Sequence, residues 1–199
     1  KAIAQNAMER GEDPVPDLKR AIASYRQALR NENDLSYTKI YNNLGRAYEL
    51  MGLYLMDQGR LPSESLDQAV EFYQKALDMD ATNAYLHNNL GNVHWASGKY
   101  AFAHGKDPLP ALEKAEIHYR KTIEINPDYG FAYSNLGNTL VRKAEWVVSR
   151  GGDPQSLLKE ARDLLHAAID NRPNYHNAMK NLSETYLVEA RFRARRDED

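Results

Sequence analysis

Cysteine is absent from the 199-residue sequence. Disulfide bonds, thiolate metal ligands and thiol nucleophiles are therefore excluded, and the absence fits a reducing compartment. No apolar run approaches the roughly 18 residues that span a bilayer, and no signal peptide is recognisable. We therefore expect a cytoplasmic protein without a membrane partner. Because the chain starts with Lys1 rather than methionine, we also expect that an upstream segment is missing.

An excess of one charge is also absent. The 26 Lys and Arg residues nearly balance the 28 Asp and Glu residues, which gives a formal net charge of −2. A nucleic-acid-binding module normally shows a clear basic excess, so we expect no nucleic-acid partner. Hydrophobic residues make up 42% of the chain and charged residues 27%, which is typical of a folded domain with a sizeable core.

The sequence repeats itself every 46 residues. An Asn-Leu-Gly triplet ends at Gly45, Gly91 and Gly137, and a fourth copy ends in serine at Ser183. A second signal, a glycine followed three residues later by proline, has the same period at Gly59, Gly105 and Gly151. Four copies in one register indicate stacked structural repeats.

Within each repeat, apolar residues recur at spacings of three, four and seven, which places them on one face of a helix. The leading positions are Leu18, Leu66, Leu112 and Leu158, followed by Ala21, Ala69, Ala115 and Ala161. A helix with one apolar face must bury that face against neighbours, so the pattern predicts an all-α solenoid.

The helix boundaries follow from proline, aspartate and glycine. Asp13-Pro14, Asp107-Pro108 and Asp153-Pro154 indicate an N-cap followed by proline in the first turn. We expect helices at 15–31, 36–58, 63–79, 83–104, 109–125, 129–150, 155–171 and 175–196, with residues 1–10 ending an earlier helix. The predicted organisation is a single solenoid over 1–199. It consists of a partial repeat 1–34, repeats 35–81, 82–127 and 128–173, and a terminal partial repeat 174–199.

The recurring Leu-Gly start, the later alanines and aromatics and the closing prolines Pro127 and Pro173 resemble the tetratricopeptide repeat. The resemblance implies a right-handed superhelix of antiparallel helix pairs. The family repeat has about 34 residues, so the helices here should be longer. A short extra helix after Gly52 and Gly98 is the alternative. Long repeats with Gly-x-Asp-Pro turns are also similar to arrays attached to bacterial serine/threonine kinases.

The resemblance further implies a concave groove lined by the first helix of each pair. Carried over by position, the groove residues are Asn42, Asn43, Arg46, Glu49, Tyr85, Asn88, Asn89, Asn92, Trp95, Phe131, Ser134, Asn135, Asn138, Arg142, Lys180, Asn181, Glu184 and Leu187. Asn43, Asn89, Asn135 and Asn181 recur at one position. An amide can donate to and accept from a peptide backbone, so these four could clamp a bound peptide. The alternative is that each asparagine bonds a neighbouring helix.

Other sites are poorly supported by the sequence. His87 and His94 could share a helix face but stand where Tyr41 and Tyr48 stand one repeat earlier, which favours packing over metal binding. No nucleophile lies beside a base in a recognisable motif. We expect no enzyme activity, no metal and no cofactor.

The expected function is therefore a scaffold for protein–protein interaction that binds a peptide or protein segment in the concave groove. The alternative is a structural spacer or a self-assembly module in which copies associate through the terminal helices. RNA binding is a weaker alternative because of the net charge.

Overall fold

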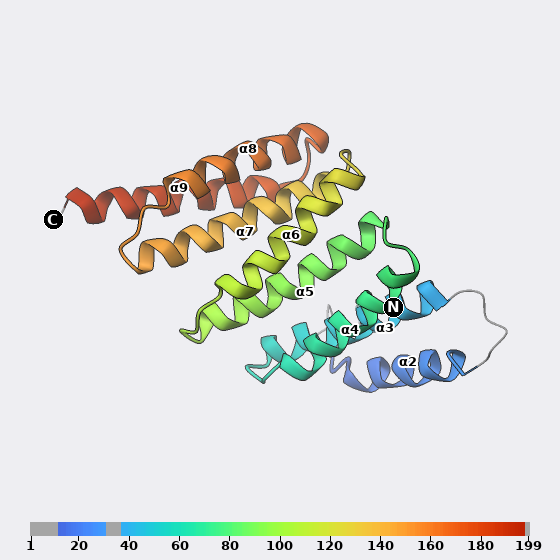
Figure 1. The fold of residues 1–199 in the computed structure, drawn as a ribbon. Helices are drawn as coiled ribbons and strands as arrows, with labels where there is room; N and C mark the ends of the chain where they lie inside the picture. Colours follow the sequence, from blue (N-terminus) through green and yellow to red (C-terminus); the bar gives the residue numbers. More distant parts are fainter. Residues whose placement is uncertain (1–11, 31–36, 198–199) are drawn as a thin grey trace. The chain divides into compact units, whose positions relative to one another are not determined.

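The computed structural model describes residues 12–30 and 37–197, and eight α-helices lie within these ranges (Figure 1). The helices are α2 (Val15–Ala28), α3 (Tyr37–Asp57), α4 (Ser63–Met79), α5 (Ala84–Ala103), α6 (Leu109–Ile125), α7 (Gly130–Ser149), α8 (Gln155–Asn171) and α9 (His176–Asp197). The prediction of an all-α helical-repeat fold is confirmed, and the helix bounds agree with the prediction to within a few residues. The predicted helix at 1–10 lies outside the described residues.

Aspartate before proline begins three of the helices as expected. Asp13 Oδ1 accepts a hydrogen bond from the amide of Val15 at 2.9 Å, and Asp107 and Asp153 repeat the same 2.9 Å contact two residues ahead. Each proline already has helical backbone angles. The carboxylate therefore accepts an amide of the first turn that has no partner within the helix. Helix α4 begins after Pro62 without this aspartate.

Glycine ends three of the long first helices. Gly59, Gly105 and Gly151 have positive φ angles of 66°, 67° and 76°, a conformation that costs other residues a steric penalty. The amide after each of them bonds the carbonyl five residues back, as Arg60 does to Leu55 at 2.7 Å. This is the Schellman arrangement that satisfies the last carbonyls of a helix.

The glycines that the family places at a turn do not break the helices here. Gly52 lies inside α3 and Gly98 inside α5, so a short extra helix is not formed. Their role is close packing, because a Cβ on Gly52 would lie 2.5 Å from Leu66 Cδ2 and one on Gly98 would lie 2.6 Å from Leu112 Cδ2.

The chain divides into two compact units, residues 1–93 and 94–199, with the boundary inside α5. In the first unit α3 packs against both α2 and α4, around a core that includes Leu44, Leu50 and Phe72. In the second unit α7 contacts α6, α8 and α9, and its core includes Tyr119, Leu136 and Leu140. A first helix that contacts both its own second helix and the next first helix is typical of stacked repeats. Within the described ranges, no helix has the length and apolarity needed to cross a membrane.

Candidate binding surface

The recurrent asparagines lie on the first helices, and two of them bond the preceding first helix. Asn89 on α5 donates its side-chain N–H to Asn42 Oδ1 on α3 at 3.1 Å. Asn181 on α9 donates in the same way to Ser134 Oγ on α7 at 3.3 Å. Asn42 and Ser134 stand at one repeat position, so the two contacts are equivalent. One N–H of each of these amides therefore joins consecutive repeats.

Asn43, the first of the series, lines a pocket of about 350 Å³ between α2 and α3. Leu18, Ala47 and Leu50 provide apolar wall, and Arg46 provides a guanidinium. The side chain of Arg46 is 28% exposed. The pocket therefore combines apolar surface with one amide and one cation, a combination suited to holding a polypeptide side chain together with its backbone.

A buried carboxylate holds Arg46 in place. Arg46 donates to Glu49 Oε1 at 2.8 Å, and the phenol of Tyr73 on α4 donates to Glu49 Oε2 at 2.7 Å. Burial, and after it the charge of the Glu49 carboxylate, raises the pKa of Tyr73 well above its ordinary value. Burial alone would lower the pKa of Arg46, but the adjacent Glu49 raises it. The guanidinium therefore stays charged at the pocket.

The aromatic residues expected in the groove have different environments. Tyr85 is 62% exposed. Phe131 is half-buried, edge-on to Tyr129 and Tyr175, and the Arg172 guanidinium lies 4.1 Å from its ring centre. Of these candidates, Tyr85 is the most accessible to a partner.

One repeat position that was assigned to the groove is largely buried in the first three repeats. Glu49 is 2% exposed and bonded to α4, and Trp95, which stands 46 residues later, packs against the core of the second unit. The next residue of the series, Val141, is fully buried. Leu187, the fourth residue of the series, is 50% exposed on α9.

The remaining candidates are polar and lie on α5, α7 and α9. Asn88 is buried, Asn92, Asn138 and Glu184 are half-buried, and Lys180 is exposed. Arg142 donates to Glu145 at 2.6 Å.

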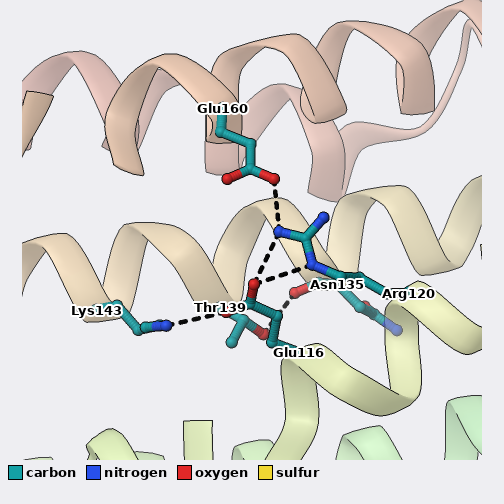
Figure 2. Close-up of polar contacts among 6 residues, drawn as sticks. All are labelled: Glu116, Arg120, Asn135, Thr139, Lys143 and Glu160. Carbon is teal, nitrogen blue, oxygen red and sulfur yellow. Dashed lines mark hydrogen bonds and ion pairs between the residues drawn. The ribbon is translucent and has the colours of Figure 1, made fainter. Parts of the chain in front are cut away.

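An ion-pair network that the sequence analysis missed lies beside Asn135 (Figure 2). Glu116 on α6 accepts from Lys143 on α7 at 2.9 Å and from Arg120 at 2.8 Å, and Arg120 also reaches Glu160 on α8 at 2.6 Å. The backbone carbonyl of Asn135 accepts from Thr139 Oγ1 at 2.8 Å. The network ties the second helix α6 to the following first helix, on which Asn135 lies.

The sequence does contain a signal for this network. Arg162 and Glu189 stand 46 residues after Glu116 and Lys143, and they pair at 2.8 Å with the charges exchanged. Complementary charges at equivalent repeat positions are detectable once the period is known.

The histidines take part in packing and backbone contacts. The rings of His94 and His118 stack at 5.6 Å, and His87 Nε2 lies 3.2 Å from the carbonyl oxygen of Ala81. Among residues 12–30 and 37–197, no three metal-ligating side chains group closely enough to hold an ion.

Comparisons with known proteins point to one family. Residues 63–98 match the family model described as a TPR repeat, which confirms the resemblance to the tetratricopeptide repeat. No curated protein matches the chain.

Three solved structures are similar at low identity. The first TPR of Spaghetti (RPAP3), bound to the HSP90 peptide SRMEEVD, is 20% identical over 75% of this chain and 95% of that chain, with a TM-score of 0.45. The first TPR domain of human RPAP3 is 20% identical, with coverages of 77% and 98% and a TM-score of 0.48. MamA is 18% identical, with 95% of each chain covered and a TM-score of 0.48.

Proposed function

We propose that this chain, which contains a tetratricopeptide repeat, is a protein–protein interaction module that holds a polypeptide segment on the first helices of its repeats. Tetratricopeptide-repeat domains are protein-interaction modules, which supports the general class. The observation that carries the more specific proposal is the pocket of about 350 Å³ beside Asn43 and Arg46. A backbone amide or carbonyl can pair with Asn43 while a side chain enters the apolar part of the pocket.

The pocket alone gives modest affinity. Burying one apolar side chain contributes about 1.5–3 kcal/mol, and a hydrogen bond from Arg46 to a charged acceptor about 1.5–3 kcal/mol. A micromolar complex needs about 8 kcal/mol. Further contacts in the first unit must therefore contribute, and the exposed Tyr85 on α5 is the candidate that we assign to this role.

The test is a titration of ¹⁵N-labelled protein with a peptide selected from a displayed random library. We expect shifts concentrated on α3, α5, α7 and α9, and weaker binding by Asn43→Ala. Gln74→Ala on α4 is the matched control, because Gln74 is exposed and its contact is with Asp78 of the same helix. Shifts confined to α4, α6 and α8 would overturn the proposal.

A second candidate function is self-association through α9. Tyr186 and Leu187 are 51% and 50% exposed, whereas Leu140 and Val141, one repeat earlier, are 1% and 0% exposed. An apolar helix face of this kind can pair with another copy. Light scattering after size-exclusion chromatography tests it: a mass that rises with concentration and falls in Leu187→Glu supports self-association, and a constant monomer mass rejects it. A spacer role would show neither peptide binding nor assembly.

A further inference from the structure

We infer that a second, smaller pocket on the first helices of the second unit takes an apolar side chain that is flanked by acidic residues. The inference rests on the proposed function, because it names the partner chemistry for one part of that surface. The pocket has a volume of about 230 Å³ and lies at the C-terminal ends of α5, α7 and α9. It is smaller than the roughly 300–1,000 Å³ of small-molecule sites, so its size suits a single side chain.

The walls of this pocket include apolar residues from three helices. Phe102 comes from α5, Val148 from α7 and Val188 from α9. Val148 and Val188 are 8% and 2% exposed, so they are fixed by the core. Phe102 packs edge-on against Trp146, with ring centres 5.9 Å apart. Walls held rigid in this way lose little conformational freedom when a leucine, methionine or phenylalanine side chain enters.

The lining also contributes net positive charge. Arg191 and Arg195, both on α9, belong to the lining. The acidic group of the lining, Glu145, is neutralised by Arg142 at 2.6 Å. The C-terminal ends of α5, α7 and α9 add partial negative charge of about half a unit each, about 1.5 units together, which the two arginines outweigh. A segment with Asp or Glu beside its apolar residue is therefore complementary to the pocket.

The arginines are placed to donate outward as well as to stabilise the fold. Arg195 uses one N–H on the carbonyl of Val148 at 3.2 Å, and a guanidinium has further donors in the same plane. Arg191 is 64% exposed and lies 4.0 Å from Glu184, beyond hydrogen-bond distance. Charge stabilisation of a helix C-terminus accounts for the contact of Arg195 with α7. Arg191 forms a long, exposed ion pair with Glu184, and an exposed pair of this kind is weak, so its guanidinium can also reach an acidic partner.

The experiment is selection from a random 16-residue peptide library displayed on phage, with the folded 199-residue chain as bait. We expect enriched sequences to share Leu, Met or Phe next to Asp or Glu. Arg191→Glu/Arg195→Glu should lose these sequences or enrich Lys and Arg instead, and Ser149→Trp, which fills the pocket from its exposed edge, should lose them. The control pair Lys159→Glu/Arg196→Glu changes the net charge by the same amount at exposed positions outside the pocket lining, and it should retain the enriched sequences.

An enriched peptide is then synthesised and its affinity measured by calorimetry, after circular dichroism shows that each variant is folded. We expect at least a tenfold loss of affinity with the paired arginine reversal and less than a threefold loss with the control pair. Enriched peptides that ignore the reversal and Ser149→Trp would overturn this inference and leave the proposed function standing. Enrichment of no peptide by the wild-type chain would overturn both.

Discussion

The buried carboxylate of Glu49 offers the sharpest test of how the first repeat is held together. Glu49 is 2% exposed and receives one hydrogen bond from Arg46 and one from Tyr73. Replacing Arg46 with alanine leaves the carboxylate with Tyr73 as its partner. Removing one member of a buried ion pair costs about 3–5 kcal/mol. We expect about 3 kcal/mol, because Arg46 is 28% exposed and water from the adjacent pocket can hydrate Glu49.

The third repeat shows how the same place is filled without charge. Asn138, Val141 and Leu165 stand where Arg46, Glu49 and Tyr73 stand in the first repeat, and both Val141 and Leu165 are fully buried. The triple variant Arg46→Asn/Glu49→Val/Tyr73→Leu therefore copies a packing solution that this chain already contains. Replacing a buried ion pair by packed apolar residues is often close to neutral, so we expect the triple variant to be at least about 1.5 kcal/mol more stable than Arg46→Ala.

The assay is urea unfolding followed by circular dichroism, in which a change of midpoint at constant slope reports stability. Hydrogen exchange of the α3 and α4 amides assigns the loss to the first unit. An Arg46→Ala variant within about 0.5 kcal/mol of wild type would show that the ion pair is well hydrated. A triple variant no more stable than Arg46→Ala would show that the apolar packing of the third repeat does not transfer.

Three further predictions concern the packed glycines and the ion pairs. Gly45→Ala should cost about 1–3 kcal/mol, because its Cβ would lie 2.7 Å from the rigid, buried Tyr73 ring. Gly52→Ala should cost less than about 1 kcal/mol, although its Cβ would lie 2.5 Å from Leu66 Cδ2, because that methyl ends a flexible side chain and Ala144 already occupies this position in the third repeat. Equal thermal melting points of the two variants would contradict this. Lys143→Glu, which places a carboxylate beside Glu116, should lower the free energy of unfolding by about 1–3 kcal/mol. Lys143→Met removes the cation without adding a like charge, so in the same thermal melts it should lower stability by less. Burial alone would raise the pKa of Glu116, but hydrogen bonds from Lys143 and Arg120 lower it below its ordinary value of 4.5. The stability that the ionised Glu116 contributes to the fold is therefore present above pH 4.5 and is lost as the pH falls through the lowered pKa. Glu116→Gln should therefore flatten the decline in unfolding free energy as the pH falls below 4.5, and an unchanged decline would show that Glu116 does not contribute.

Much of the fold was predictable because its signals are local. The Asp-Pro pairs and the glycines with positive φ begin and end helices through contacts within a few residues, so the sequence placed these boundaries closely. The 46-residue period also identified which residues are equivalent, and with it the series of asparagines. Local spacing could not show that Gly52 serves packing rather than a turn, because that depends on Leu66 of the next helix.

The candidate site depended more on tertiary structure. Glu49 and Trp95 were assigned to the groove from their positions in the repeat. On a helix, however, residues that point toward the groove and residues that point toward a neighbouring helix lie close together around the axis, so repeat position alone does not separate them. Likewise, the sequence could name Asn89 and Asn181 but not their partners, Asn42 and Ser134, which lie 47 residues away. The sequence by itself determined the helices, their order and their repeat. The tertiary structure decided which faces are buried and which polar groups meet, because burial and hydrogen bonding depend on neighbours that are distant along the chain.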